Sequence, residues 1–218
     1  MSALTFDAEG RRLATGGSDN FIRVWDLAGA SPPTVLRNAG TAKSKGDWPW
    51  RLAFIEGGRL LSARGGGAVR FWDLGTRAMH QVDHHQSYRG DGAPSPDASL
   101  VATGGRDKRI RISDRRTGKV LRVLSGHPNS VRSLAWSPDG ATLASGDTAG
   151  QVRLWDVATG ESRVLAGHRN EVLKLLFRAG GDDLVSASRD GTVRIWDDSL
   201  PRDPDSLRKH IAASLEIQ

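Results

Sequence analysis

The chain has 218 residues, of which 38% are hydrophobic and 26% are charged, with a net charge of +6. This composition is sufficient for a folded core and argues against global disorder. There is no cysteine, which excludes disulfides and cysteine-based zinc sites and is compatible with a cytoplasmic location. No apolar run approaches membrane-spanning length, so no membrane association is expected. The positive charge favours acidic partners or nucleic acid without distinguishing them.

One short pattern recurs five times along the chain. It alternates apolar residues with Arg and ends in Trp-Asp, except that the third copy has Ser113 in the Trp place. The copies are Ile22–Asp26, Val69–Asp73, Ile110–Asp114, Val152–Asp156 and Val193–Asp197. The Trp places, at positions 25, 72, 113, 155 and 196, are 47, 41, 42 and 41 residues apart. Such a period predicts repeated structural units of one size.

Each copy follows a second predicted strand. These lead-in strands are Leu13–Gly17, Leu60–Ala63, Val101–Gly105, Leu143–Gly146 and Leu184–Ala187. A Gly- or Asp-rich turn joins the two strands, which predicts a hairpin. Turns with Pro, Asp and Gly, such as Ser137–Gly140, precede the lead-in strand, and outer strands such as Val120–Leu124 follow the Trp strand.

On these motifs the chain resembles the WD40-repeat family over residues 3–198. The resemblance implies an all-β propeller of five recognisable four-stranded blades, over about 3–40, 41–87, 88–129, 130–170 and 171–198. It also implies a non-enzymatic protein–protein interaction scaffold or sensor module, of a bacterial signalling type, with no cofactor and no metal. Function in such a fold lies in its loops and channel.

The resemblance further implies a buried hydrogen-bond network within each blade, from His through Ser or Thr and Asp to the Trp ring nitrogen. The candidates are His168, Ser186 or Ser188, Asp190 and Trp196 in the fifth repeat, His127, Ser145 and Trp155 in the fourth, His85 and Asp107 in the third, and Asp19 and Trp25 in the first. In the fourth repeat Ala149 takes the Asp position, and the nearby Asp147 is the candidate substitute. The second repeat has Gly66 there and no matching His. A hydrolase triad is disfavoured because these residues recur with the period and no G-x-S-x-G elbow occurs.

The number of repeats indicates an incomplete or open ring. Seven blades of this period need about 290 residues, and the first and last repeats both lack the strand that normally closes the ring. We expect the C-terminal part of a larger propeller, whose partners are other proteins or the missing N-terminal part of its own propeller. The rival is a closed or self-associating five-blade ring.

Two segments depart from the repeat. Residues 38–50 combine Lys43 and Lys45 with Trp48 and Trp50, so they could bind a ligand or nucleic acid by charge and stacking. The alternative is that both Trp pack on a blade edge. Residues 88–94 stand where an apolar inner strand is expected, which predicts a poorly formed strand or reflects a local reading-frame error. Arg64 and Arg89 complete the six candidate binding residues.

The tail, residues 199–218, is predicted to form a short helix after a Pro-rich segment, with Leu207, Ile211 and Leu215 on one face.

Two other functions remain open. One is a nucleic-acid-binding subunit that uses the Lys/Trp loop, and it predicts steep salt dependence. The other is an enzyme, which the absence of a phosphate loop and of metal-spaced His beyond His84–His85 disfavours.

Overall fold

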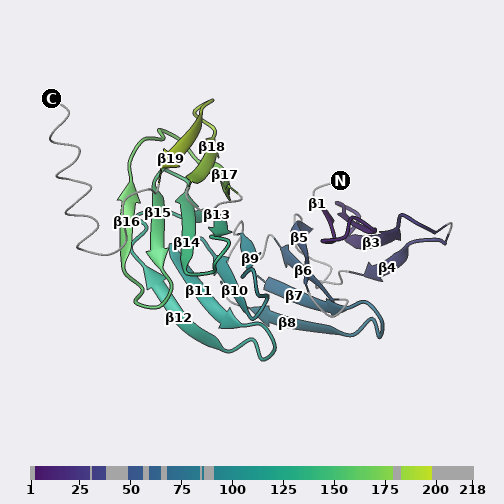
Figure 1. Cartoon of the computed structure of the whole chain (residues 1–218). Coiled ribbons are helices and arrows are strands. Elements are labelled where there is room, and N and C mark those ends of the chain that lie inside the picture. The colour runs from purple at the N-terminus through teal and green to yellow at the C-terminus, as the bar shows by residue number, and fades with distance from the viewer. Residues whose placement is uncertain are drawn as a thin grey trace, which may run out of the picture.

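The computed structural model describes residues 3–29, 31–37, 49–55, 59–64, 68–83, 85, 91–178 and 183–197. Within these ranges the chain forms strands, turns and bends, and no residue is helical. The strands build five separate antiparallel sheets that follow one another along the chain (Figure 1). We call these sheets blades 1 to 5. The expectation of an all-β chain of repeated antiparallel sheets is therefore confirmed.

The blades have these strands. Blade 1 comprises β1 (Ala3–Phe6), β2 (Arg12–Gly16), β3 (Phe21–Asp26) and β4 (Thr34–Arg37). Blade 2 comprises β5 (Pro49–Ile55), β6 (Arg59–Arg64), β7 (Ala68–Asp73) and β8 (Met79–Asp83). Blade 3 comprises β9 (Gly92–Pro94), β10 (Leu100–Gly104), β11 (Arg109–Asp114) and β12 (Val120–Ser125). Blade 4 comprises β13 (Val131–Trp136), β14 (Thr142–Asp147), β15 (Val152–Asp156) and β16 (Ser162–Leu165), and blade 5 comprises β17 (Val172–Phe177), β18 (Asp183–Ser188) and β19 (Val193–Asp197).

The register of the central hairpin is the same in every blade. The residue in the Trp place always pairs with the first apolar residue of the lead-in strand. The pairs are Leu13 with Trp25, Leu60 with Trp72, Val101 with Ser113, Leu143 with Trp155 and Leu184 with Trp196. A one-residue slip would turn every side chain to the opposite face. The four Trp residues and Ser113 therefore occupy equivalent points of five equivalent sheets.

Successive blades pack through opposite faces of their sheets. On β15, Val152 and Leu154 point to one face and Trp155 to the other, because side chains alternate along a strand. Val152 and Leu154 join a hydrophobic cluster with blade 5, whereas Trp155 joins a cluster with blade 3. Blades 1 and 2 pack with the same polarity, through Ile22 of blade 1 and Trp72 of blade 2. The Ile/Val face of one blade thus covers the Trp face of the next.

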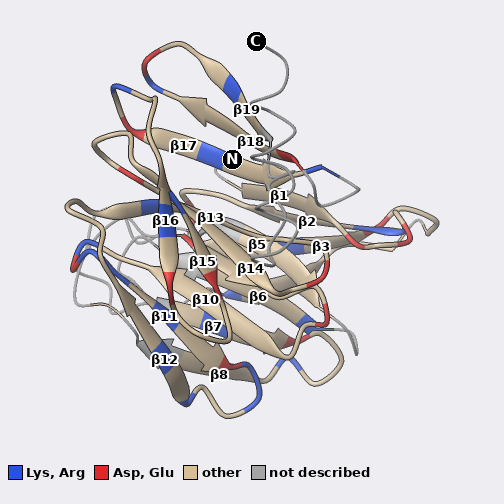
Figure 2. Cartoon of the chain, turned by 60° about the vertical axis from the view of Figure 1, so that its left-hand side comes forward, with Lys and Arg blue, Asp and Glu red and all other residues tan. Residues whose placement is uncertain are grey.

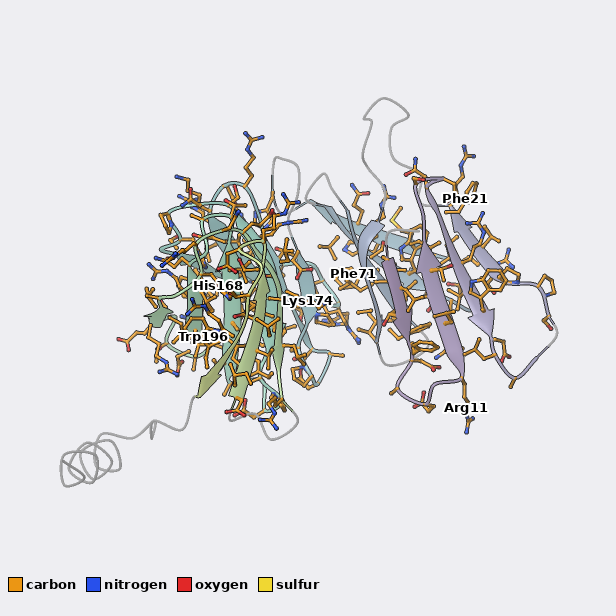
Figure 3. The ribbon with its side chains drawn as sticks, turned by 90° about the horizontal axis from the view of Figure 1, so that it is seen from above. Arg11, Phe21, Phe71, His168, Lys174 and Trp196 are labelled. Atoms are coloured by element: carbon orange, nitrogen blue, oxygen red, sulfur yellow. The ribbon has the colours of Figure 1, made fainter. Side chains whose placement is uncertain are left out.

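The five blades form an open arc. Blade 1 and blade 5 lie at its two ends, with no strand pairing between them, and Figure 3 shows them on opposite sides of the molecule. The innermost strands β1, β5, β9, β13 and β17 all line one central space of about 660 Å³. This space is the channel of the arc.

Two expectations about single blades can be compared with the described residues, and one about the tail lies outside them. Blade 5 has three strands and no outer strand after β19 in the described part of the chain, as expected for the last repeat, so four blades rather than all five are four-stranded. Blade 3 has the poorly formed inner strand expected from residues 88–94, because β9 is only three residues long. The expected helix in residues 199–218 lies outside the described residues.

Candidate interaction site

Blade 5 holds a complete polar network around Ser186. Its Oγ lies 2.7 Å from His168 Nε2 and accepts a 2.8 Å hydrogen bond from Trp196 Nε1. The other ring nitrogen, His168 Nδ1, lies 2.9 Å from Asp190 Oδ2. One tautomer satisfies every contact: Trp196 donates to Ser186, Ser186 donates to Nε2, and Nδ1–H donates to Asp190. Ser188, the other serine candidate, instead donates to the backbone oxygen of Asn170 at 2.9 Å.

The carboxylate of Asp190 is strongly stabilised in its charged form. Hydrogen bonds from the Thr192 hydroxyl and from the Arg169 backbone amide lower the pKa of Asp190 well below its usual range, and His168 adds to the effect. Asp190 therefore stays ionised and orients the His168 ring, which in turn holds the Ser186 hydroxyl.

Blade 4 builds the same network with a different acid. Ser145 Oγ lies 2.6 Å from both His127 Nε2 and Trp155 Nε1, and the ring nitrogen Nδ1 of His127 lies 3.3 Å from Asp147 Oδ2. Burial raises the pKa of Asp147, but hydrogen bonds from His127 and from the backbone amides of Gln151 and Ala149 lower it further than burial raises it. Asp147 thus contacts the histidine of blade 4 as Asp190 contacts the histidine of blade 5.

Blades 1 and 2 keep only the Trp end of the network. Trp25 Nε1 donates to Thr15 Oγ1 at 3.2 Å, and Trp72 Nε1 donates to Ser62 Oγ at 2.9 Å. Asp19, the candidate in blade 1, forms a 2.7 Å ion pair with Arg23 instead of meeting a histidine. The sequence reasoning did not single out Thr15 or Ser62, although both stand ten residues before a Trp, as Ser145 and Ser186 do.

Blade 3 keeps the histidine end. His85 Nδ1 lies 2.9 Å from Asp107 Oδ1, and His85 Nε2 lies 3.1 Å from Thr103 Oγ1. No indole is present, because Ser113 occupies the Trp place, and the Arg111 guanidinium contacts both His85 and Asp107. Burial lowers the pKa of His85 below its ordinary value, so the neutral ring is favoured.

These networks do not form a hydrolytic site. Ser145 and Ser186 are fully buried, and each hydroxyl is already held between a histidine and an indole. A nucleophilic serine needs space for a substrate next to its oxygen. The arrangement instead ties the lead-in strand and the Trp strand of one blade to the loop that precedes its inner strand.

The candidate binding residues of the sequence analysis are not brought together by the described structure. Lys43, Lys45, Trp48 and Arg89 lie outside the described residues, and only the backbone of Trp50 in β5 and of Arg64 in β6 is described. The Lys/Trp loop therefore remains a prediction. Figure 2 shows Lys and Arg both in turns and on strands such as β12, β16 and β17. Lys174 of β17 lines the channel.

The two ends of the arc expose apolar blade faces. Val193 and Ile195 of blade 5 are 68% and 65% exposed, whereas their equivalents in blade 4, Val152 and Leu154, are 0% and 4% exposed. The other end is similar: Trp25 of blade 1 is 38% exposed, against 2% for Trp155. The set on blade 5 also includes Leu176, and the set on blade 1 also includes Leu4, Phe6 and Leu27. We call these sets the Ile/Val end face and the Trp end face.

Comparison with known proteins agrees with this architecture. The family pattern described as "WD domain, G-beta repeat" matches residues 1–26, 80–114, 118–156 and 160–197. The chain belongs to the WD40 family. WD40 domains are generally non-catalytic modules that bind other proteins. Blade 2, most of which the family pattern does not match, nevertheless forms a WD40 blade with the common register.

Similar WD40 proteins are longer than this chain. Rat apoptotic protease-activating factor 1 is 31% identical over 159 residues, which is 72% of this chain and 12% of that protein. Serine-threonine kinase receptor-associated protein of Dictyostelium discoideum is 30% identical over 62% of this chain and 43% of its own length. Human WD repeat and SOCS box-containing protein 1 is 37% identical over 67% of this chain and 37% of its own length. The chain therefore matches less than half of each relative.

In the described part of the chain there is no helix that could span a membrane, and no cluster of three or more His, Asp or Glu with metal-binding geometry.

Proposed function

We propose that this protein is a non-enzymatic WD40 interaction scaffold, and that its main binding surfaces are the two end faces of the arc. The observation that carries the proposal is the exposure of Val193 and Ile195, whose equivalents at the interfaces between blades are buried. Apolar patches of this kind on a protein surface mark sites of association.

The polarity of the blades specifies what fits each end. At the interfaces within the arc, the Ile/Val face of one blade meets the Trp face of the following blade. The Ile/Val end face therefore suits a blade that offers a Trp face, and the Trp end face suits a blade that offers Ile and Val. Further WD-type blades inserted between blade 5 and blade 1 satisfy both ends at once. We propose such blades as the occupant, supplied by the N-terminal part of a larger propeller or by a partner protein.

A fusion tests this proposal on the full chain. A second copy of residues 130–197 joined to the N-terminus adds two blades, with a Trp face at the start and an Ile/Val face at the end. Covering the seven exposed apolar side chains is worth about 1 kcal/mol each or more. We expect the melting temperature to rise by about 10 °C or more, at about 2–4 °C per kcal/mol for a chain of this size.

Two variants of the fusion make the result specific. Ile195→Lys in the C-terminal blade should remove the part of the gain that comes from the Ile/Val end face, because it puts a charge on that face. Val164→Lys, on the outer strand β16, is the matched control, since Val164 is also exposed but lies on neither end face. A fusion that melts like the original chain, or an Ile195→Lys fusion that melts like the unmodified fusion, contradicts the proposal.

Light scattering of the chain alone tests whether a second copy of the chain, instead of further blades, covers the end faces. A closed dimer that Ile195→Lys disrupts would identify a second copy as the occupant and would contradict the proposal of further blades. We extend the proposal to a cytoplasmic signalling scaffold of bacterial type; the cysteine-free composition is compatible with the cytoplasmic location.

A further inference from the structure

Blade 3 carries an arginine where blades 1, 2 and 4 carry an apolar residue. Two residues after the Trp place stand Leu27, Leu74 and Val157 in blades 1, 2 and 4, and Arg115 in blade 3. The backbone position is equivalent, because the amides of Leu27, Arg115 and Val157 all donate to the turn before the lead-in strand, at 2.8–3.0 Å. Leu74 and Val157 pack into the cluster shared with the preceding blade. Arg115 faces blade 2 in their place.

The guanidinium of Arg115 lacks a full set of partners. Its Nη1 atom is buried, and it donates no hydrogen bond in the described structure. A buried nitrogen of a charged group without an acceptor is costly, so such a group is normally met by an anion or a hydrogen-bond acceptor. The acid that lines the same place, Asp73, is already held by two hydrogen bonds from Thr76 and faces Arg59 at 3.9 Å.

A cavity lies beside Arg115. It has a volume of about 310 Å³ and lies between blades 2 and 3, with Ile55, Phe71, Trp72, Met79 and His80 of blade 2 in its wall. The rings of Phe71 and His80 are stacked, with their centroids 6.4 Å apart and an interplanar angle of 25°. Figure 3 shows Phe71 on the blade 2 side of the arc. The volume is at the lower end of the range for small-molecule pockets.

The charge around the cavity is positive. Arg59, Arg115 and Arg116 line it, against the single carboxylate of Asp73. The pKa of Asp73 is lowered, chiefly by hydrogen bonds from the Thr76 backbone and hydroxyl. The Asp73 carboxylate is therefore ionised and hydrogen-bonded within its own turn. The cavity thus combines an aromatic and thioether wall with a guanidinium that has unused donor capacity.

We propose that this cavity binds a carboxylate carried on an aromatic or aliphatic body, with the Arg115 guanidinium on the carboxylate and the Phe71 ring against the body. The planar fork of a guanidinium matches the two oxygens of a carboxylate, and the contact gains strength away from water. The carboxylate can belong to a free organic acid or to the C-terminal residue of a polypeptide. The site is separate from both end faces, so it does not depend on the interaction proposed above.

Binding of benzoate to the full chain, followed by isothermal titration calorimetry, tests the proposal. Benzamide is the neutral control of the same shape. We expect saturable binding of benzoate, binding of benzamide at least about tenfold weaker, and a similar loss of benzoate binding in Arg115→Gln, as for the removal of one charged hydrogen-bond pair. Arg106→Gln, an exposed arginine on the β10–β11 turn of the same blade, should bind benzoate like the wild type.

A second pair of probes distinguishes the source of the carboxylate. N-acetyl-Gly-Phe with a free C-terminus is compared with its C-terminal amide. Binding of the free peptide acid alone identifies a polypeptide terminus, and binding of benzoate identifies a small acid; either result supports the proposal if Arg115→Gln weakens it.

Two results would overturn it: no saturable binding of either acid, or equal binding of an acid by wild type and Arg115→Gln. Because Arg115→Gln could alter the fold, Arg115→Leu provides a second check. It restores the apolar residue of the other blades, so it should raise the melting temperature while abolishing benzoate binding.

Discussion

Replacing Ser145 by Ala should destabilise the protein more than its small change in volume suggests. The Ser145 hydroxyl lies 2.6 Å from both the Trp155 indole nitrogen and the His127 ring nitrogen, and all three residues are buried. Without it, an indole donor and a ring acceptor are left without partners. Each unsatisfied buried group costs about 1–3 kcal/mol. We expect a loss of about 2–4 kcal/mol, or about 5–15 °C in melting temperature for a chain of this size.

The matched comparison is Thr15→Ala in blade 1. Thr15 holds the same register position and accepts a 3.2 Å hydrogen bond from Trp25. Trp25 is partly exposed, so water can replace the lost acceptor, and no histidine adjoins it. We expect a loss below about 1 kcal/mol. Ser62→Ala in blade 2 should fall between the two, because Trp72 is buried but again has no histidine partner.

Differential scanning calorimetry and urea unfolding of the three variants measure the order of these losses. Circular dichroism of each variant before unfolding verifies that the sheets are intact. If Ser145→Ala and Thr15→Ala lost the same stability, burial of the network would not govern its energetic contribution, and the reasoning above would be wrong.

Two further perturbations test the pH dependence and the packing of the blades. Burial lowers the pKa of His85 below its ordinary value of 6.5, so the unfolded state takes up more protons than the folded state as the pH falls through that value. The contribution of neutral His85 to stability is therefore fully present above pH 6.5 and declines below it. Urea midpoints at pH 7.5 and 5.5 should show a smaller decline in His85→Gln than in the wild type; equal declines in the two proteins would refute this role of His85. In Gly146→Ala the new Cβ would lie 2.6 Å from Val172 of blade 5, which should cost about 1–3 kcal/mol. Gly75→Ala, whose nearest contact is 3.5 Å away, should be close to neutral, and equal stability of the two variants would argue against close packing of blades 4 and 5.

The repeat, the hairpins and most of the polar network were predictable from the sequence. A blade is an antiparallel meander with short connections, so all its turn signals and its alternation of apolar residues lie within about forty residues. In blade 5, His168, Asp190 and Trp196 all belong to one such stretch. The same locality explains why the register of blade 2 could be predicted from Leu60 and Trp72, although its turn residues depart from the pattern.

Contacts made within a turn or between blades could not be predicted in this way. The pattern offered Asp147 only as a candidate substitute, because whether its carboxylate reaches His127 depends on the path of the turn. Likewise, nothing in the sequence distinguishes Arg115 from the other basic residues of the turns. Packing against blade 2 is what leaves its Nη1 atom buried beside a cavity.

The sequence by itself determined the central hairpin of each sheet and the face that each of its side chains takes, because strand alternation and turn chemistry are local. The tertiary structure decided which of those faces are covered. Val152 and Val193 stand in the same motif, yet one is buried and the other exposed, because within the described residues only Val152 has a following blade against it. Burial of a sheet face depends on the neighbouring sheet, and no pattern within one repeat contains that neighbour.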